Sequence, residues 1–481
     1  MLRVENRPSG AAFAVCVATA ALTLLDLSKI NVTLPAIQHS LGATPSELQL
    51  LVVGYALAFG LALIPAGRYG DARSRRRLLL IGLALFALTS LACSLAFTAG
   101  QLVTGRLAQG IVAGVLMPQV LGIIQQLYSG KARVRAFGAI GIVTGLCVAL
   151  GPTVGGLLIT IGGDAFGWRL IWLMNVPLGI ALLPFAFRFI PRDAVHRTRH
   201  ADLDPFGLTL LAAAVGCLLA PFVLTTGRSA DVPQRWWLLI GFAVLVAAFV
   251  VWERAYTRRG GSPVVDIELF RIGSFRLGTV LSGLQFTALP ATFLVLNLYV
   301  QQGLHQTPFV GGLILLPYSA AYMLSAWVSV PLSARMGRGY VVLGFGLMLI
   351  GLALTLLAGQ WAPADTRTWA LGLAWAVAGV GTGGLGAQLQ ALSLSDVPAG
   401  SGGISGSITQ LAQRLGTAVG VAAASTLYYV PTAMIPGAEG FHVGFLRASA
   451  FAVSVTSVAL VLASVAVIAR HRRWREGPRP E

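Results

Sequence analysis

The N-terminal part of the chain contains the run AAFAVCVATAALTLLDLSKINVTLPA (residues 11–36), in which Asp26 and Lys29 are the only charged side chains. A helix needs about 20 apolar residues to cross the hydrocarbon core of a bilayer, so this run is long enough to span a membrane. The apolar stretch continues past residues 18–20, Ala-Thr-Ala, where a signal peptidase could cut. We therefore predict that the run is retained as the first transmembrane helix.

Further apolar runs of similar length follow along the chain. Transmembrane β-strands would be shorter and would alternate apolar with polar residues, which these runs do not. The sequence therefore predicts an all-α integral membrane protein with fourteen transmembrane helices. After residues 11–36, the predicted spans are 46–66, 78–97, 101–128, 136–161, 168–190, 206–226, 236–253, 275–300, 309–332, 339–358, 368–394, 403–430 and 443–469.

The composition excludes several classes of protein. The 481 residues include only 34 basic and 17 acidic side chains, together 11% of the chain, and the mean hydropathy is +0.78. Soluble domains carry about 25% charged residues, so a soluble enzyme and a disordered chain are both excluded. The four cysteines lie inside apolar runs, and neither CxxC nor HExxH occurs, so we expect no disulfide framework and no metal site.

Basic residues are distributed unequally over the loops between the predicted spans. If the N-terminus is cytoplasmic, 26 of the 34 lysines and arginines fall on the cytoplasmic side. Cytoplasmic loops of membrane proteins carry an excess of Lys and Arg. Only an even number of spans preserves this asymmetry along the whole chain. We therefore predict that both termini are cytoplasmic and that the protein lies in the plasma (cell or inner) membrane.

Four ionisable residues lie well inside predicted spans: Asp26, Lys29, Arg106 and Arg414. Such a group costs about 2.5–3.5 kcal/mol at the bilayer centre on insertion scales, which makes each a functional candidate. Asp26 and Lys29 are three residues apart and share one helix face, which Thr33 continues. They form either an internal ion pair that lets both tolerate burial, or a proton carrier beside a substrate contact. A tight pair would keep Asp26 ionised until substrate or a conformational change separates the two groups.

The two buried arginines are also open to two interpretations. Arg106 is followed by Gln109, and Arg414 lies between Gln410 and Gln413. The five donors of a guanidinium can bind backbone carbonyls and brace the packing of helices. Alternatively, they can face a cavity and contact the transported compound.

A glycine-rich and proline-containing run lies in mid-membrane, with Gly145, Gly151, Pro152, Gly155 and Gly156. Small residues at four-residue spacing let helices approach closely, and Pro152 removes a backbone hydrogen bond and bends the helix. Such contacts suit helices that slide or rock against one another. The chain has neither the phosphate-binding motif GxxxxGK(S/T) nor a soluble domain large enough for ATP hydrolysis. We therefore expect secondary transport driven by an ion gradient, with no cofactor.

The predicted spans divide into two six-helix halves joined by two extra spans. Duplicated halves with a binding site at their interface are a common plan for transporters. Each half has a short basic turn after a proline-containing span, at residues 65–77 and 331–338. The predicted units are residues 1–190 with spans 1–6, residues 191–273 with spans 7 and 8, residues 274–470 with spans 9–14, and a basic cytoplasmic tail at residues 471–481.

With these features the sequence resembles the major facilitator superfamily and, within it, the family of fourteen-span drug:proton antiporters. The resemblance covers nearly the whole chain and rests on five stretches that occur in order. They are residues 25–35 (LDLSKINVTLP), 67–77 (GRYGDARSRRR), 106–110 (RLAQG), 145–156 (GLCVALGPTVGG) and 168–179 (WRLIWLMNVPLG).

The resemblance implies functions for individual residues. The first-span and fourth-span motifs imply proton coupling by Asp26 and Arg106, and the fifth-span motif implies conformational change by the glycine run and favours export over import. The loop motif implies gating by Gly67, Arg68, Asp71, Arg75 and Arg76. In the gating interpretation Asp71 latches onto Arg68 or Arg75, and in the alternative the basic turn serves only topology. The residues implied to line the substrate cavity are Lys29, Asn31, Thr33, Gln109, Gln119, Tyr299, Gln301, Gln388, Gln390 and Arg414, although Tyr299 and Gln301 also fit a position at the extracellular rim.

The sequence departs from the family pattern at two positions. Lys29 stands where the family usually has an apolar residue, and Ser74 stands where it usually has a glycine. A lysine beside Asp26 would suit an anionic or zwitterionic substrate better than a purely cationic one. The second basic turn lacks an acid equivalent to Asp71, so we expect gating charge in the first half only.

We therefore predict a secondary exporter, not an enzyme, that exchanges protons for a small amphipathic compound, drug-like or antibiotic-like, by alternating access. One alternative is a dedicated exporter of a single endogenous metabolite or lipid precursor. Lys29 would suit such a compound if it is an anion. Another is a membrane receptor or scaffold that kept the fold and lost transport. A channel is disfavoured because no filter sequence or ring of repeated charges occurs. The expected partners are the substrate, protons and lipid, with no nucleic acid, and the expected state is a monomer.

Overall fold

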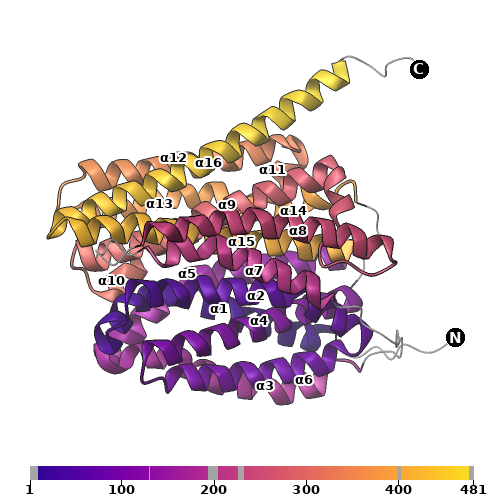
Figure 1. Cartoon of the computed structure of the whole chain (residues 1–481), viewed down its shortest axis with the longest axis horizontal. Coiled ribbons are helices and arrows are strands. Elements are labelled where there is room, and N and C mark those ends of the chain that lie inside the picture. The colour runs from indigo at the N-terminus through magenta and orange to yellow at the C-terminus, as the bar shows by residue number, and fades with distance from the viewer. Residues whose placement is uncertain (1–8, 129, 193–203, 226–231, 398–401, 476–481) are drawn as a thin grey trace.

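The computed structural model describes residues 9–128, 130–192, 204–225, 232–397 and 402–475, and every regular element within these residues is a helix (Figure 1). The first half contains α1 (Ser9–Leu41), α2 (Pro45–Ala72), α3 (Arg75–Ser94), α4 (Ala99–Leu127), α5 (Gly130–Leu173) and α6 (Asn175–Phe189). The connecting region contains α7 (Pro205–Val223), η1 (Pro233–Trp237), α8 (Leu238–Arg258) and η2 (Ile267–Arg271). The second half contains α9 (Gly273–Leu298), η3 (Tyr299–Gly303), α10 (Pro308–Leu313), α11 (Leu316–Met336), α12 (Gly339–Trp361), α13 (Arg367–Thr382), α14 (Leu385–Leu394), α15 (Gly402–Met434) and α16 (Ala438–Arg475).

Thirteen helices of the described chain are long and apolar enough to cross a membrane. They correspond to the predicted spans except for 403–430, which forms α15, a helix of 33 residues that contains Arg414. The count of fourteen therefore stays a prediction, as does the side of the membrane on which the termini lie. The first helix begins and the last helix ends at the same end of the bundle, as an even number of crossings requires (Figure 1).

Polar side chains fix where several of the spans begin. At the start of α2, Glu47 N donates to Thr44 Oγ1 (3.3 Å) while Thr44 N donates to Glu47 Oε2 (2.8 Å), which is a capping box. At the start of α3, Arg77 N donates to Ser74 Oγ (3.1 Å). These bonds satisfy N–H groups that have no partner in the first turn of a helix. Ser74, which departs from the family pattern, thus has a local structural role.

The helix α5 includes a break that separates two predicted spans. Gly163 has φ 67° and ψ 174° inside it, a left-handed conformation that glycine adopts without strain. The chain packs tightly at this bend, because a Cβ on Gly162 would lie 2.8 Å from the backbone N of Gly167. The predicted spans 136–161 and 168–190 therefore lie on either side of the bend.

Two seams join the halves. At one seam α5 packs against α10 and α11, and a Cβ on Gly312 would lie 2.8 Å from Thr153 Cα. At the other seam α2 packs against α15, and a Cβ on Gly60 would lie 2.9 Å from Arg414 Cβ. Glycine at these points removes the side chain that would otherwise hold the helices apart.

The extra hairpin α7–α8 lies along the second of these seams. α7 contacts both α2 and α15, and Thr426 Oγ1 of α15 donates to the carbonyl of Phe222 in α7 (2.8 Å). Ile64 of α2, Phe249 of α8 and Leu411 of α15 share one buried apolar cluster. The two extra spans thus cover the α2–α15 seam in addition to joining the halves.

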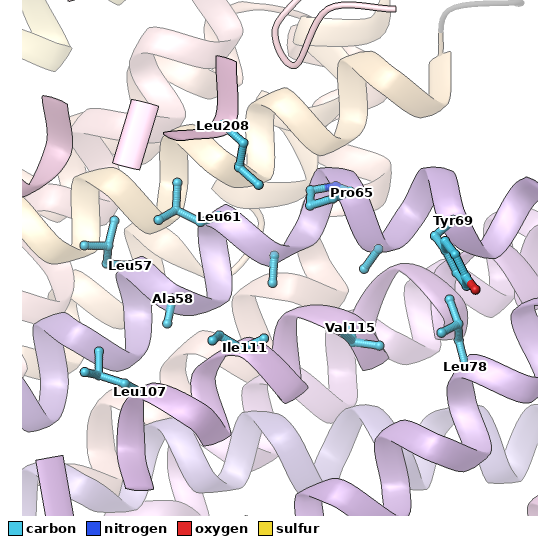
Figure 2. A pocket seen from close by; sticks show the side chains of 12 residues that line it. Leu57, Ala58, Leu61, Pro65, Tyr69, Leu78, Leu107, Ile111, Val115 and Leu208 are labelled. Carbon is cyan, nitrogen blue, oxygen red and sulfur yellow. The ribbon is translucent and has the colours of Figure 1, made fainter. Parts of the chain in front are cut away.

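An apolar pocket of about 650 Å³ lies between α2, α4 and α7 (Figure 2). Its lining includes Leu57 of α2, Ile111 of α4 and Leu208 of α7, and Tyr69 is the one lining residue with a polar side chain. None of the residues predicted to bind substrate lines this pocket. The ionisable groups within the membrane lie elsewhere.

Candidate functional site

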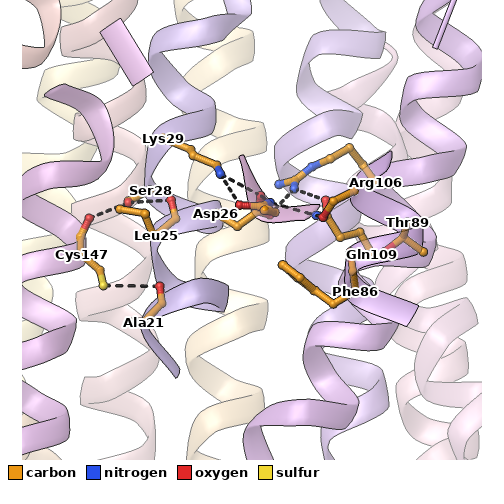
Figure 3. Close-up of polar contacts among 12 residues, drawn as sticks. Ala21, Leu25, Asp26, Ser28, Lys29, Phe86, Thr89, Arg106, Gln109 and Cys147 are labelled. Atoms are coloured by element: carbon orange, nitrogen blue, oxygen red, sulfur yellow. Dashed lines mark hydrogen bonds and ion pairs between the residues drawn. The ribbon is translucent and has the colours of Figure 1, made fainter. Parts of the chain in front are cut away.

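Six polar residues from four helices of the first half meet at one buried point, and Figure 3 shows Lys29, Asp26 and Arg106 pointing toward one another. Asp26 is 1% exposed and the other five are fully buried. We call these residues the polar cluster. They are Asp26 and Lys29 from α1, Ser90 from α3, Arg106 and Gln109 from α4, and Asn175 from α6.

Asp26 is the acceptor at the centre of the polar cluster. Arg106 Nη1 donates to Asp26 Oδ2 at 2.6 Å, and Asn175 Nδ2 donates to Asp26 Oδ1 at 2.7 Å. Lys29 Nζ lies 3.6 Å from the same Oδ1. An ionised carboxylate only accepts hydrogen bonds, and a charged donor makes such bonds short. The arrangement is therefore that of an ionised Asp26.

Lys29 is held chiefly by Asn175. Its Nζ donates to Asn175 Oδ1 at 2.6 Å, closer than its approach to Asp26. Asn175 therefore accepts from the lysine and donates to the carboxylate, so it bridges the two charges of α1. The structure brings Asp26 and Lys29 into an ion pair with Asn175 beside it. Whether Lys29 also contacts substrate stays a prediction.

Arg106 and Gln109 connect the carboxylate to other helices. Arg106 Nη1 also donates to Gln109 Oε1 (2.7 Å), and Gln109 Nε2 donates to Ser90 Oγ (2.8 Å). Arg106 Nε donates to the carbonyl of Leu51 in α2 (3.3 Å). Arg106 thus braces α4 against α1 and α2 while it pairs with Asp26. Both interpretations of this arginine agree with these contacts.

A row of side chains leads from Arg106 across the α2–α15 seam. The Arg106 guanidinium lies 4.0 Å from the ring centroid of Tyr55, and the Arg414 guanidinium lies 4.2 Å from that of Phe59. The two rings, one turn apart on α2, are 6.2 Å apart. Arg414 is 8% exposed and has no carboxylate partner among the described residues. Desolvated cation–π contacts of this kind contribute about 2 kcal/mol.

The glycine run of α5 lies between α1 and the second half. A Cβ on Gly155 would lie 3.1 Å from the carbonyl oxygen of Lys29, and one on Gly151 would lie 2.8 Å from Ser28 Cβ. On the side of the second half, a Cβ on Gly156 would lie 2.9 Å from the Cα of Phe309 in α10. Larger side chains here would push α5 away from either neighbour. The role of the run in conformational change stays a prediction.

Two further members of the run lie at the same seam. A Cβ on Gly145 would lie 3.0 Å from the ring of Tyr322 in α11. Pro152 contributes the carbonyl carbon that would lie 3.0 Å from a Cβ on Gly312 of α10. The predicted run therefore contacts the second half at three levels along α5.

Arg68, the first arginine of the loop motif, holds the segment that follows α8. Its Nη1 donates to the carbonyl of Ser262 (2.7 Å), and its Nη2 donates to the carbonyl of Pro263. The side chain of Asp71 lies outside the described residues, so its predicted latch with Arg68 or Arg75 stays a prediction. Gly67 lies against α4, since a Cβ on it would lie 3.5 Å from Pro118 Cβ.

Two further arginines of the loop motif reach other helices of the first half. Arg75 donates to the carbonyl of Pro118 in α4 (3.2 Å). Arg76 donates to the carbonyl of Phe187 in α6, and its guanidinium lies 5.0 Å from the ring of the same residue. These contacts place both arginines in the packing of α3 against its neighbours.

The expectation that gating charge lies in the first half only stays a prediction, although the second basic turn has an acid near it. Arg338, in the second basic turn, lies 3.9 Å from Asp396 at the end of α14. The acid comes from a distant part of the chain, so the turn itself gave no sign of it. The Asp396 side chain is 62% exposed, and such exposed pairs contribute little to stability.

Three other predicted cavity residues lie in the first half. Gln119 Nε2 donates to the carbonyl of Ala66 in α2 (2.9 Å). Thr33 donates to the carbonyl of Ile30 in its own helix (2.7 Å). Asn31 Oδ1 is buried and has no hydrogen-bond partner in the described part of the chain. The structure does not bring these residues into the polar cluster.

The remaining predicted cavity residues lie in the second half. Tyr299 Oη is 3.2 Å from His442 Nδ1, and Gln301 Nε2 donates to the carbonyl of Val32 in α1 (3.3 Å). Whether these two residues lie at the extracellular rim or line the cavity stays a prediction. In the helix α14, Gln388 Nε2 donates to Ser333 Oγ (3.0 Å), while the carbonyl of Gln390 accepts from Ser393 (2.8 Å).

Sequence reasoning missed residues that complete the polar cluster. Asn175 lay inside the stretch of residues 168–179, where a polar side chain among apolar ones was an available signal. Ser90 and Tyr55 gave no such signal, because isolated hydroxyls are common in membrane helices. Burial of a second group of acids was also missed: Asp204 and Glu253 lie at helix ends, as expected, yet each is only 1% exposed.

Comparisons with known proteins agree with this architecture. The chain is 32% identical over 427 residues to a probable actinorhodin transporter of Streptomyces coelicolor, covering 87% of this chain and 72% of that protein. It is 31% identical over 422 residues to a methylenomycin A resistance protein of the same species, covering 86% and 85%. A crystal structure of the peptide transporter POT shares the fold, with a TM-score of 0.66 and 15% identity over 96% of both chains. The sequence profile of the Major Facilitator Superfamily matches residues 12–421, and the chain therefore belongs to the Major Facilitator Superfamily.

Proposed function

We propose that the protein exports a small amphipathic compound from the cell in exchange for protons, which enter through Asp26. Membership of the superfamily makes the chain a multi-pass membrane transporter and not an enzyme. Export of an antibiotic-like compound is supported by the names of the two relatives, an actinorhodin transporter and a methylenomycin A resistance protein. We place the protein in the plasma membrane with both termini in the cytoplasm, as the arginine distribution favours.

The observation that carries the proposal is the bond between Asp26 and Arg106. A carboxyl group that is 1% exposed, on a helix long enough to span the membrane, needs strong partners to stay ionised. Arg106, Lys29 and Asn175 supply them. A proton that binds to Asp26 removes the charge that these partners neutralise. Protonation and the position of Arg106 are therefore linked.

This linkage gives two states of the site. In the proton-free state, which has the contacts described above, Arg106 Nη1 is bound to Asp26 and to Gln109. In the protonated state the ion pair is lost, and Arg106 and Lys29 retain only neutral partners. Two arrangements of one buried pair provide the bistable element that alternating access requires. We propose that the compound binds in the proton-free state and leaves before Asp26 is protonated from outside.

Movement between the two states would occur at the seams. The α5 glycines contact α1 beside Lys29 and also contact α10 of the second half. A displacement of α1 at the polar cluster is therefore transmitted to a helix that touches both halves. Arg414 lies at the opposite seam with its Nε buried and without a partner in the described chain, which supports a contact with an acceptor group of the compound.

A dedicated exporter of one compound is the second candidate. The names of the two relatives each refer to a single compound, actinorhodin or methylenomycin A. The range of compounds that the protein transports separates this candidate from a multidrug exporter. Transport of one antibiotic to the exclusion of chemically unrelated compounds would identify a dedicated exporter.

The test is accumulation of compound in proteoliposomes that contain the purified full-length protein. With an imposed inside-acid pH gradient, we expect uptake of actinorhodin or methylenomycin A into vesicles, together with proton efflux reported by a pH-sensitive dye. Asp26→Asn should abolish both, because an amide cannot carry the proton. Glu268→Gln is the matched control, since the Glu268 side chain is 76% exposed.

Two results would contradict the proposal. One is uptake that persists when the pH gradient is dissipated. The other is gradient-driven uptake by Asp26→Asn at the rate of Glu268→Gln. Equal loss in both variants would point to damage unrelated to the proton site.

A further inference from the structure

Two acidic residues outside the polar cluster are buried at one end of the α7–α8 hairpin. Asp204 is the N-cap of α7 and Glu253 lies near the end of α8, and each is 1% exposed. Asp204 Oδ1 accepts from Gly207 N and from Trp252 Nε1, both at 2.9 Å. Glu253 Oε2 accepts from Val265 N at 3.4 Å. Each carboxyl thus has one oxygen bound to neutral N–H groups.

The second oxygen of each carboxyl has no donor. Asp204 Oδ2 and Glu253 Oε1 are buried and lack a hydrogen-bond partner within the described residues. Both lie beside Gly207, because a Cβ on this glycine would overlap Asp204 Oδ2 and lie 2.7 Å from Glu253 Oε1. Two ionised carboxylates that share a buried site repel, and one proton held between them removes the repulsion. The two free oxygens face the same small space beside Gly207.

The neighbouring cation favours a proton over a metal ion at this site. Within the described residues, Asp204 of α7 and Arg68 of α2 are the charged groups that act on Glu253. Arg68 donates to the carbonyls of Ser262 and Pro263, so these backbone oxygens are not free to bind a metal ion. A second full cation would also meet the charge of Arg68. A proton needs neither a further ligand nor a larger space.

We propose that Asp204 and Glu253 form a proton-binding site, distinct from Asp26, that fixes the α7–α8 hairpin to the loop motif of the first half. With the proton present, the ends of α7 and α8 stay together and Glu253 Oε2 holds Val265. This positions the carbonyls of Ser262 and Pro263 for Arg68. Loss of the proton leaves two like charges in contact, which separates the helix ends and loosens the attachment of Arg68.

This site goes beyond the proton exchange proposed at Asp26. It lies in the two spans that join the halves and at the contact of the arginine that the loop motif assigns to gating. The proton concentration at that end of the bundle would therefore change how firmly Arg68 of the loop motif is attached, without any proton binding at the polar cluster. The proposal makes no use of the transported compound.

Infrared difference spectroscopy of the full-length protein in lipid vesicles tests the proposal directly. A protonated carboxyl has a carbonyl-stretch band that an ionised carboxylate lacks. We expect the wild type to lose such a band as the pH rises from mildly acidic to alkaline, and Glu253→Gln to lack it throughout. Asp204→Asn should shift its loss to lower pH, because the repulsion is gone. Asp26→Asn and the exposed control Glu268→Gln should keep the band, which separates this site from the proposed coupling residue.

Thermal unfolding gives a second readout. The folded pair holds a proton that the unfolded chain releases, so the Tm of the wild type should fall as the pH rises from the range in which an ordinary carboxyl ionises to the range in which the band is lost, and should level off above it. Glu253→Gln mimics the neutral acid and should keep a constant Tm over that range, while Glu268→Gln should follow the wild type. Absence of the band in the wild type, or a band that neither Glu253→Gln nor Asp204→Asn alters, would overturn the proposal.

Discussion

At the scale of the residue, Asn175 is the side chain on which the polar cluster depends most. Its Oδ1 accepts from Lys29 at 2.6 Å while its Nδ2 donates to Asp26 at 2.7 Å, so one amide satisfies two opposite charges. An ionised acid offers only acceptors, and Lys or Arg offers only donors, so none of these could take both roles. An apolar residue would leave both charges under-satisfied in a site with no access to water.

We therefore expect Asn175→Leu to lower the free energy of unfolding by about 3 kcal/mol or more, because it removes hydrogen bonds to two buried charged groups. Denaturant or thermal unfolding of the purified protein in detergent measures this. Asn31→Leu is the matched control, since Asn31 Oδ1 is buried without a partner in the described chain and its loss leaves no charge exposed. Similar destabilisation by the two variants would show that Asn175 has no special role.

At the scale of the element, α5 is the helix of the first half that packs against the second half at one of the two seams. Its glycines let it lie against α1 on one side and against α10 and α11 on the other. At Gly156 the contact is with the backbone of Pro308 and Phe309, so no side chain there can relax to admit a larger residue. This close packing suits a helix that must shift between two positions without unlocking interdigitated side chains.

Gly156→Val should lower the rate of transport by about tenfold or more. Overpacking a close contact costs about 1–3 kcal/mol in the state in which α5 and α10 are packed together. The measurement is pH-gradient-driven uptake into proteoliposomes, with circular dichroism to establish that helical content is kept. Gly216→Val, in α7, places the same side chain where nothing lies within 4 Å and should transport at the rate of the wild type. Full activity of Gly156→Val would show that this seam does not move or tolerates the added volume.

The α7–α8 hairpin is the second element whose attachment makes a specific prediction. Arg68→Ala removes the donors that hold the carbonyls of Ser262 and Pro263. Amide hydrogen exchange of residues 260–266 should accelerate severalfold, as measured by mass spectrometry on the full-length protein. Arg76→Ala removes an arginine of the same loop that binds α6 instead, so it should leave this segment unchanged. Unaltered exchange in Arg68→Ala would mean that packing alone fixes the segment.

At the scale of the whole molecule, the sequence predicted what depends on the order of residues along the chain. The length of the apolar runs located the transmembrane spans, since runs such as 46–66 and 339–358 lie inside α2 and α12. Spacing along one helix placed Asp26 beside Lys29. The buried arginines were recognised from their cost in lipid, and the structure shows Arg106 bound to Asp26.

What the sequence did not reveal depends on contacts between distant segments. Ser90, Asn175 and Asp26 are far apart along the chain, and nothing local indicates that their side chains meet. The partner of Arg338 was missed for the same reason, because Asp396 lies in the turn after α14, far along the chain. The burial of Glu253 near a helix end required knowledge of how α7 and α8 pack.

The central claim is that a proton and the compound exchange at Asp26, and proton release on binding tests it most directly. The compound transported in proteoliposomes is added to purified protein in weakly buffered, mildly acidic detergent solution, and the pH change is recorded alongside quenching of tryptophan fluorescence. The account predicts proton release from the wild type and from Glu268→Gln, with none from Asp26→Asn although the compound still binds. Equal proton release from Asp26→Asn, or binding to the wild type without any release, would contradict it.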